Sequence, residues 1–590
     1  MNNGYRNLPV ASSMEMETAG SDTAFVKWLQ ASLNKVLGLS LAVDGIAGTQ
    51  TRNAIRQFQQ LKGLLVDGIA GTQTVTALRA ALGSAPTPYI PPPRPTPTPY
   101  IPPPRPAPTP TPSLPNIQDQ VRRWFVTGGS PPMQPVRPDN LAIPLVGGAQ
   151  AFREMVRAIR TANAPGHYIY LLGWILYDNF QLIPGDTTST IASLFATASS
   201  RGVQVRAMLW DQLGTQNTAE VDRIDRLPNG AAILDNRTLN FGSHHQKILV
   251  VKGNEGLIAF CGGVDINPDR INASSGGGSS SGSGSGGSGT GGAPLQDVHC
   301  RITGLAAHDL LRIFMERWSD HPDHSARDRA KGTLLGAQEP LPAPAGKMYV
   351  QIARTYGNGT RNRGIGSGGY RFAPNGERTI QRMVENAIRQ ARKFIYLEDQ
   401  YLINMEISAA LVSALPNIQH LTIVIPHAKL YSGQECPSKM YDYQKRFISP
   451  LRSAGGNKVR VFCPSPAGAP NTYVHSKMWI FDDEFAIIGS ANVNRRSYTH
   501  DSEVTAGIYD PAPRSAAKQL RIWLWAKHLN LQMPANQAAL EDGVAAGALW
   551  LSLSPGARVA PFSFSASVPG DRWPQCFGPG WTTIVDPFGG

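Results

Sequence analysis

The chain has 590 residues, which is too long for one hydrophobic core, and two to four folded units are expected. Its residues are 41% apolar and 16% charged, which excludes a chain that is disordered throughout. The formal net charge of +13 favours an anionic partner, and phospholipid headgroups, nucleic acid and cell-wall polymer all satisfy it.

Cysteine spacing and apolar runs narrow the class of protein further. The five cysteines form no CxxC pair, so we expect small buried side chains rather than a zinc knuckle or a disulfide framework. They are Cys261, Cys300, Cys436, Cys463 and Cys576. Residues 1–22, expected to be flexible, lack the basic stretch and apolar core of a secretory signal. No apolar run reaches the ~18–20 residues that span a bilayer, and the richest, Tyr168–Tyr177, is typical of a buried strand.

An internal repeat marks the first predicted domain, residues 23–83. The sequence VDGIAGTQT occurs at Val43–Thr51 and again at Val66–Thr74. Its Asp-Gly pairs predict tight turns, and we expect the threonines that follow to cap the next helices. Between the copies, apolar residues recur at helical spacing. They are Ala54, Ile55, Phe58 and Leu61. The domain should therefore be a bundle of about three helices.

This pattern resembles the peptidoglycan-binding module that is attached to many cell-wall enzymes. The resemblance covers nearly all of residues 23–83 and implies that peptidoglycan is a partner. The alternative is a docking module of the same fold that has no affinity for glycan.

A proline-rich linker is expected at residues 84–113. The sequence PTPYIPPPRP occurs at Pro86–Pro95 and again at Pro97–Pro106. Such a segment cannot donate the backbone hydrogen bonds of a core and extends as polyproline II, so we interpret it as a semi-rigid spacer. A ligand for a proline-binding partner is the second interpretation.

From about residue 114 the pattern alternates short apolar strands with helices, which predicts an α/β fold. We divide it into residues 114–340 and residues 341–590, the second including a C-terminal extension. The expected strands are Tyr168–Leu176, Val203–Trp210, Lys247–Val251, Leu421–Ile425 and Val459–Phe462. A helix is expected at Glu377–Lys393. Residues 274–292 are almost pure Gly and Ser and predict a disordered loop.

One segment of the part at residues 341–590 carries a chemical motif, VHSKMWIFDDEFAIIGSAN. On a strand, residues two apart share a face, so His475 and Lys477 should point to one spot. Asp482 ends that strand and is expected to be structural. The following apolar run leads to Ser490 and Asn492, where small residues admit a phosphate and the amide can donate to a phosphoryl oxygen.

The part at residues 114–340 contains an imperfect copy about 230 residues earlier, HHQKILVVKGNEGLIAFCGGVDIN. His245 and Lys247 repeat the geometry, and Gly263 and Asp265 fall where Ser490 and Asn492 fall in the other copy. Duplicated half-sites predict two similar lobes that meet face to face around one active site.

Two histidines and two lysines suit phosphodiester cleavage without a metal. One imidazole attacks phosphorus to form a phosphohistidine, and the other protonates the leaving alcohol and then activates water. The lysines, Asn492 and Asn267 are candidates to neutralise the equatorial oxygens. Chemistry at neutral pH needs one imidazole neutral and the other protonated, so the pair should titrate jointly. The residues alone leave open which histidine is the nucleophile.

The motif HxKxxxxD followed by GSxN at His475–Asn492 resembles the signature of the phospholipase D superfamily in full. The copy at His245 matches in HxK and in GG.D, but Lys252 stands where the motif has Asp, which puts the role of that carboxylate in doubt. Further stretches, such as LLGWIL, GGVDIN and YLEDQYL, look like the lipid-hydrolysing branch of that superfamily.

The resemblance implies two mixed-sheet α/β/α lobes with the active site at their interface. It implies that each histidine is oriented by a carboxylate downstream of the opposite motif, at Asp297 and Glu503. By analogy His245 is the nucleophile and His475 the acid and base. Asn267, Asp265, Gly263 and Ser490 are expected at the substrate. No cofactor or metal is required, although calcium can influence members of the family.

Other histidines and acids near the motifs have plainer interpretations. His244 should face away from His245 and be structural, and a zinc site at this pair is not expected, because partners at ligand spacing are missing. For His299, His427 and His500 a hydrogen-bonded structural role is favoured over contact with phosphate. Glu398 and Asp399 either shape the pocket or are solvated loop acids.

The sequence thus predicts a phospholipase D that hydrolyses glycerophospholipids to phosphatidic acid and a headgroup alcohol. The alternatives are a nuclease of the same superfamily, a cardiolipin-synthase-like transferase, and a cell-wall binding protein whose catalytic domain is inactive. A nucleic acid partner is not expected, because no aromatic residues interleaved with Lys and Arg mark a groove.

Two features bear on the expected location: the wall-binding module and the lack of a visible secretory signal peptide. We expect a protein that is cytoplasmic in its producer and is then exported, without a classical signal peptide, to the envelope or periplasm of a target cell. A secretion machine such as a type VI system would deliver it as an antibacterial toxin, and an immunity protein would be a further partner.

Overall fold

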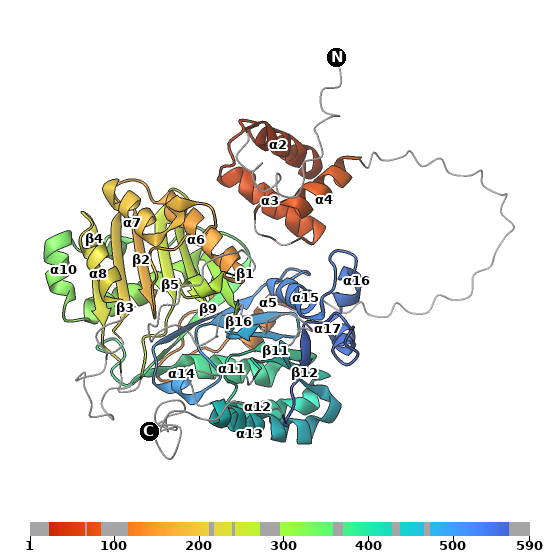
Figure 1. The fold of residues 1–590 in the computed structure, drawn as a ribbon. Coiled ribbons are helices and arrows are strands. Elements are labelled where there is room, and N and C mark those ends of the chain that lie inside the picture. The colour runs from red at the N-terminus through yellow and green to blue at the C-terminus, as the bar shows by residue number, and fades with distance from the viewer. Residues whose placement is uncertain are drawn as a thin grey trace, which may run out of the picture. The chain divides into compact units, whose positions relative to one another are not determined.

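The computed structural model divides into two units, Met1–Asn116 and Ile117–Gly590. It describes residues 23–64, 66, 68–83, 116–211, 217–238, 242–271, 295–357, 370–427, 437–464 and 472–565 (Figure 1). The predicted flexible segment 1–22, the linker 84–113 and the Gly/Ser loop 274–292 lie outside these residues, as do Cys436 and Cys576. The boundary that we predicted near residue 114 falls at residue 117 in this division.

The described residues of the first unit form three helices, as predicted. They are α2 (Thr23–Leu37), α3 (Thr49–Lys62) and α4 (Thr72–Gly83). Their core includes Ala54, Ile55 and Phe58, but Leu61 is 63% exposed, so its assignment to the buried face was wrong. The helix α3 ends one residue later, at Lys62, with Gly63 in the left-handed conformation, so Leu61 lies in its last turn.

Buried glutamines hold the two repeated turns of this unit. Gln30 donates to Asp44 Oδ1 at 2.8 Å and to Thr51 Oγ1 at 3.0 Å. Gln59 makes the equivalent bond to Thr74 Oγ1 at 2.9 Å. The threonines therefore bond to glutamine side chains, and the predicted helix capping by Thr51 is wrong, because α3 is capped by Gly48 without a side-chain hydrogen bond.

The second unit is an α/β structure built on one mixed sheet (Figure 1). The strands of its first half are β1 (Arg137–Val146), β2 (Tyr168–Gly173), β3 (Gln204–Trp210), β4 (Gly230–Asp235), β5 (Ile248–Gly253), β6 (Gly256–Gly262) and β8 (Val298–Thr303). Those of its second half are β9 (Met348–Tyr356), β11 (Phe394–Glu398), β12 (His420–Val424), β13 (Val459–Pro464), β15 (Met478–Phe481), β16 (Phe485–Gly489) and β17 (Glu503–Tyr509). Two short strands, β10 (Glu377–Arg378) and β18 (Val559–Pro561), add to the second half.

The two halves repeat each other strand for strand. Outward from the centre, the order is β1-β8-β6-β5-β2-β3-β4 in one half and β9-β17-β16-β15-β11-β12-β13 in the other. The pairs β2·β3, β3·β4, β11·β12 and β12·β13 are parallel, and the matching remaining pairs are antiparallel. The halves join where β1 pairs with β9. The duplication of the two motifs is therefore a duplication of the whole strand arrangement.

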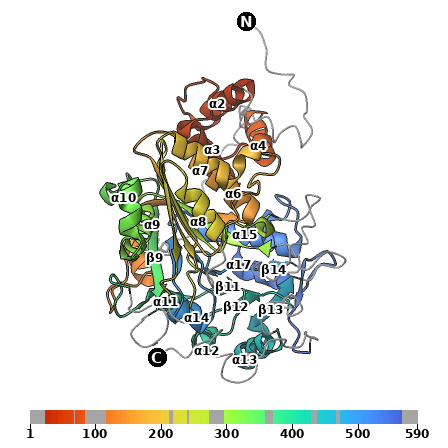
Figure 2. The same ribbon diagram turned by 60° about the vertical axis from the view of Figure 1, so that its left-hand side comes forward.

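Helices cover both faces of the sheet. In the first half, α6 (Gly148–Thr161), α7 (Ile191–Ser200) and α8 (Thr218–Asp225) share a core with one face, as Figure 2 shows. In the second half, α5 (Ile117–Trp124), α11 (Thr379–Gln390), α12 (Met405–Ala414) and α13 (Pro437–Gly455) share a core with the sheet. A central core, common to both halves, contains α9 (Leu305–Asp320) and α15 (Ala516–Leu529). The remaining helices are α10 (His324–Lys331), α14 (Arg495–Thr499), α16 (Gln537–Leu540) and α17 (Gly543–Ala546).

Several predicted elements shift at their ends. The predicted helix at Glu377–Lys393 begins with the short strand β10 and ends at Gln390, and the predicted strand at Tyr168–Leu176 ends at Gly173. Cys261, Cys300 and Cys463 are free and buried, which confirms for these three the expectation of small buried side chains.

Candidate active site

Both HxK segments lie beside strands rather than within them. His245 and Lys247 precede β5, and His475 and Lys477 lie between β14 (Tyr473–Val474) and β15. Our placement of these residues on strands was therefore wrong. The backbone is nevertheless held by hydrogen bonds to the other half of the sheet.

These cross-half hydrogen bonds are equivalent in the two motifs. The His245 N–H donates to Ser502 O at 3.0 Å, and the His475 N–H donates to Gln296 O at 2.7 Å. β14 also pairs in parallel with β7 (Leu295–Gln296), as the His244–Ser502 bridge does on the other side. Each motif is thereby anchored next to the residue that precedes the other half's carboxylate.

The anchoring brings each imidazole onto a carboxylate of the opposite half. His475 Nδ1 lies 2.7 Å from Asp297 Oδ2, and His245 Nδ1 lies 2.9 and 3.0 Å from the two oxygens of Glu503. Both carboxylates are buried. Because Nδ1 of each ring is held by a carboxylate, Nε2 is the ring nitrogen left for reaction with a substrate.

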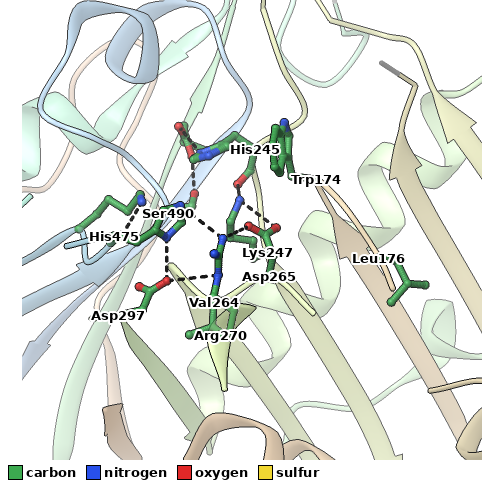
Figure 3. A network of polar contacts seen from close by, with 12 residues as sticks. Trp174, Leu176, His245, Lys247, Val264, Asp265, Arg270, Asp297, His475 and Ser490 are labelled. Atoms are coloured by element: carbon green, nitrogen blue, oxygen red, sulfur yellow. Dashed lines mark hydrogen bonds and ion pairs between the residues drawn. The ribbon is translucent and has the colours of Figure 1, made fainter. Parts of the chain in front are cut away.

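Buried cations lie in both half-sites, and Arg270 links the two (Figure 3). Lys247 Nζ lies 3.2 Å from Asp265 Oδ1, and Arg270 Nη2 lies 3.1 Å from Asp265 Oδ2. The same Arg270 nitrogen lies 3.5 Å from His475 Nε2. On the other side, Lys477 donates to Gln400 Oε1 at 2.9 Å. A continuous series of contacts thus runs from the first motif to the second.

Burial sets the charge of the imidazoles. Burial, reinforced by Lys247 and Lys477, lowers the pKa of His245 well below its usual value, and the same effects with Arg270 lower the pKa of His475. His475 Nε2 lies 3.5 Å from the Arg270 guanidinium, which can only donate hydrogen bonds, so this contact favours the neutral form of the ring.

The carboxyl groups and Lys477 also have shifted pKa values, and a bound phosphate would reverse only the shift of Lys477. Burial raises the pKa of Asp297 and that of Glu503 to about 7, against the influence of the nearby lysines. Burial also lowers the pKa of Lys477 to about 7. Asp265 differs, because Lys247 and Arg270 outweigh the effect of burial and lower its pKa. A bound phosphate would favour the charged form of Lys477, so the cations of this centre fit a phosphate group.

Two small residues make room for the carboxylates. A Cβ atom on Gly263 would lie 2.1 Å from Asp297 Oδ1, so glycine is required there. The matching residue of the second half, Ser490, donates its hydroxyl to Glu503. The structure thus brings Gly263 and Ser490 to the orienting carboxylates, and their predicted contact with substrate stays a prediction.

The polar residues that end the two motifs, Asn492 in the second and Asp265 and Asn267 in the first, have different surroundings. The carbonyl oxygen of Asn492 is buried and has no hydrogen-bond partner among the described residues, so it remains available to a ligand. Asn267 accepts from the Asp269 N–H at 3.3 Å and caps the turn that carries Arg270. Asp265 faces two cations, and a buried carboxylate beside a phosphate would need such cations to offset its negative charge.

Asp482 lies at the far end of β15 and organises the backbone. Its carboxylate accepts hydrogen bonds from three successive N–H groups at 2.7 to 3.0 Å and from the Arg123 guanidinium at 2.7 Å. Those N–H groups belong to Arg392, Lys393 and Phe394. This agrees with the structural role that we predicted.

Lys252 occupies the corresponding end of β5 and forms an ion pair with Glu339 instead. The HxK motif and this position are five residues apart along an extended segment, or roughly 16 Å. The departure from the motif at Lys252 is therefore compensated locally and lies away from the two imidazoles.

Three residues of the site were missed by sequence reasoning. Arg270 follows the first motif in INPDR, Gln400 follows a buried strand, and Trp174 stands in the LLGWIL stretch with its ring 6.3 Å from that of His245. The basic residue after the Pro-Asp pair could have suggested Arg270 as a site residue. Its burial, however, depends on contacts with Asp265 and Asp297 that no sequence period predicts.

The structure also tests the structural roles that we considered for His244, Glu398 and Asp399. His244 is fully buried, 3.1 Å from Asp235, on the side away from the carboxylate of Glu503, in agreement with a structural role. Glu398 and Asp399 are buried, so the alternative of solvated loop acids is wrong.

The other histidines near the motifs have protein partners. His299 is buried and accepts from the Val264 N–H at 3.4 Å, and His500 contacts the Thr499 hydroxyl at 2.7 Å. His427 also has an interaction within the protein. These contacts fit the structural roles that we favoured.

Metal sites and membrane spans were sought in the part of the chain that the structure describes. No three His, Cys, Asp or Glu side chains lie together there in a way that could hold a metal ion. None of the helices described has both the length and the apolar character needed to cross a bilayer. The expectations about cofactors and calcium stay predictions.

Comparison with known protein families matches both parts of the chain. The model described as peptidoglycan binding domain matches residues 22–78. The model described as Phospholipase D matches residues 215–410, and the one described as Cardiolipin synthase, PLD-like domain, matches residues 384–526. The last two matches cover both HxK motifs.

Individual relatives are more distant. Phospholipase D alpha 2 of Arabidopsis thaliana is 26% identical over 66% of this chain and 65% of its own length, and Phospholipase D alpha 1 of Vigna unguiculata is 25% identical over 67% and 66%. The chain thus spans slightly less than two thirds of the length of these relatives.

Among solved structures, a phosphatidylserine synthase of Haemophilus influenzae is 14% identical, with a TM-score of 0.46 over 71% of this chain and 97% of its own. The sequence matches decide the family: this chain belongs to the phospholipase D superfamily and carries an N-terminal peptidoglycan-binding domain.

Proposed function

We propose that this protein is a phospholipase D that hydrolyses glycerophospholipids to phosphatidic acid and a headgroup alcohol. The observation that carries the proposal is the pair of imidazoles, each backed by a carboxylate of the opposite half, around three buried cations. The similarity to plant enzymes named phospholipase D supports a lipid substrate over other phosphodiesters.

In the proposed first step His245 Nε2 attacks phosphorus, a phosphorus–nitrogen bond forms and the bond to the headgroup oxygen breaks. His475 gives its Nε2 proton to that oxygen, so the alcohol leaves neutral. Glu503 holds the His245 ring by Nδ1 while the imidazole gains positive charge, and Asp297 does the same for His475. The assignment of nucleophile follows the family, and the greater exposure of the His245 side chain, 15% against 6% for His475, supports it.

In the second step His475 takes a proton from water, whose oxygen attacks phosphorus as the bond to His245 breaks. Lys247 and Lys477 neutralise the oxygens on which charge develops, and Arg270 is available from the His475 side. Because burial and nearby cations lower the pKa of His475, a bound phosphate has to raise that pKa for the ring to act as an acid.

The decisive experiment incubates the full chain with vesicles of phosphatidylcholine or phosphatidylethanolamine and measures released alcohol and phosphatidic acid. The His245→Ala and His475→Ala variants should each lose at least about 10³-fold in rate, whereas His324→Ala, on α10, should keep wild-type activity. Cleavage of plasmid DNA with intact lipid would instead assign the protein to the nucleases.

Two other outcomes separate the remaining alternatives. Adding glycerol, or another alcohol that can accept the phosphatidyl group, tests whether the protein transfers that group instead of hydrolysing the lipid. This test is needed because a model described as cardiolipin synthase also matches the second half. Binding to peptidoglycan sacculi without turnover of lipid or DNA would identify an inactive wall-binding protein.

The proposed place of action is the envelope of a target cell, where the first unit holds peptidoglycan and the second hydrolyses membrane lipid. The match of residues 22–78 to a peptidoglycan binding domain supports it. Delivery as an antibacterial effector, with a secretion machine and an immunity protein, is the corresponding hypothesis. Fractionation of mixed bacterial cultures tests it, and protein found only in the producer's cytosol would refute delivery.

A further inference from the structure

The two halves of the site have the same strands but different side chains beside their lysines. Counting along β2 and β11 from their paired ends, Trp174 corresponds to Gln400. Lys247 Nζ lies 5.8 Å from the centre of the Trp174 ring, whereas Lys477 donates to the Gln400 carbonyl at 2.9 Å. One half-site is therefore bordered by an indole and the other by an amide.

A second tryptophan extends the aromatic surface. Trp174 follows β2 and Trp210 ends β3, and their rings stack with centroids 6.0 Å apart and planes inclined by 23°. Both side chains are only partly buried. Because these parallel strands end at the same edge of the sheet, the two indoles form one continuous apolar surface beside His245.

The backbone beneath the two indoles is fixed by one buried side chain. The Asn217 amide donates to Trp174 O at 3.1 Å and to Trp210 O at 2.9 Å, and its carbonyl oxygen accepts from the Leu176 N–H at 3.0 Å. Asn217 itself is 3% exposed and has φ +70°, in the left-handed region that asparagine tolerates. A buried residue that uses its side chain in this way indicates that the position of the indole pair is specified.

We infer that the Trp174–Trp210 pair binds the glycerol end of the acyl chains of the substrate, rather than its headgroup. The inference rests on the proposed lipid substrate. The pair adjoins His245, which is the more exposed of the two histidines, so it lies on the open side of the site. The chains of a membrane lipid must point back toward the bilayer, because apolar surface is costly to expose to water.

Electrostatics disfavours binding of the headgroup at the Trp174–Trp210 pair. Indoles also bind quaternary ammonium groups, so a choline headgroup is the obvious competitor. The Trp174 ring, however, already faces the Lys247 ammonium, and a second cation placed there would be repelled by it. In addition, if His245 attacks phosphorus, the departing headgroup lies on the far side, toward His475.

The test compares acylated with deacylated substrates in the full-length protein. Trp174→Ala and Trp210→Ala should each lower kcat/KM about tenfold or more on diacyl phosphatidylcholine, phosphatidylethanolamine and phosphatidylglycerol in mixed micelles, by similar factors for all three. Turnover of the corresponding glycerophosphodiesters should fall by a much smaller factor than turnover of the diacyl lipids. Trp523→Ala, which removes a partly buried indole from α15, is the matched control and should behave as wild type on both.

Two results would overturn the inference. A loss confined to choline substrates would show that the pair holds the headgroup, and an equal loss on acylated and deacylated substrates would show a purely structural role. Trp174→Phe keeps an apolar ring and serves if the alanine variant fails to fold.

A binding measurement distinguishes this inference from the proposed function. In the His475→Ala background, we expect phosphatidylcholine brominated near the glycerol end of its acyl chains to quench tryptophan fluorescence, and we expect Trp174→Phe to reduce that quenching. Unchanged quenching would refute the contact. Wild-type protein that turns over no lipid at all would refute the enzymatic function, while the quenching result would still decide where acyl chains bind.

Discussion

Glu503 belongs to β17 in the second half of the sheet, yet both of its carboxylate oxygens lie within 3.0 Å of Nδ1 of His245 in the first half. The preceding residue accepts the backbone N–H of the same histidine. The arrangement of Asp297 with His475 repeats this relationship in the opposite direction. Neither half can therefore orient its own histidine, which makes the site a property of the joined halves.

This dependence predicts that Glu503→Gln and Asp297→Asn each lower kcat on phospholipid vesicles by about 100-fold. The amides keep the shape of the acids but cannot stabilise an imidazolium by charge. The melting temperature should change little, and Asp222→Asn, an exposed acid on α8, should have no effect on the rate. Wild-type kcat in both variants would show that the carboxylates do not serve the histidines.

The packing of Gly263 against Asp297 leads to a second prediction. Gly263→Ala should lower kcat by more than about tenfold while leaving the protein folded, because the new methyl group forces Asp297 away from His475. Gly71→Ala, where the added Cβ meets no atom within 4 Å, is the control. Circular dichroism and lipid turnover measured on the same preparation separate lost activity from lost fold.

Asp482 and Lys252 occupy equivalent positions and should respond differently to removal. Asp482→Ala leaves three N–H groups and a guanidinium without their acceptor, so we expect the free energy of unfolding to fall by about 2–4 kcal/mol. Lys252→Ala breaks a pair whose lysine is 29% exposed and should cost no more than about 1 kcal/mol. Urea denaturation measures both.

Activity measurements complete that comparison. Each variant should retain the wild-type rate per folded molecule, because both positions lie away from the imidazoles. A selective loss of kcat in Lys252→Ala would contradict the view that this departure from the motif is compensated by Glu339.

The sequence was most informative where the chemistry is encoded in short motifs. His245, Lys247, His475 and Lys477 followed from two copies of HxK, and the partner carboxylates followed from the family resemblance. Arg270 did not, because its importance arises from contacts with acids that precede and follow it on different elements. The error at Leu61 is of another kind, since helical periodicity does not show which residues of a last turn are left exposed.

The charge of the empty site leads to a pH prediction with a definite sign. Burial and neighbouring cations lower the pKa of His245, His475 and Lys477, the last to about 7. A bound phosphate favours the protonated form of each group and raises these pKa values, so binding takes up protons. The affinity for inorganic phosphate should therefore rise as the pH falls from about 8 to about 6, although protonation of phosphate itself opposes the trend near the lower end.

Isothermal titration calorimetry in buffers of different ionisation enthalpy measures this proton uptake directly. The His475→Ala and Lys477→Met variants should each take up fewer protons than the wild type, because each lacks one of the groups whose pKa rises. His324→Ala should match the wild type. At about pH 8, where inorganic phosphate is already mostly the dianion, release of protons on phosphate binding would contradict the proposed charge state of the site, since it would require groups of the protein whose pKa falls when an anion enters.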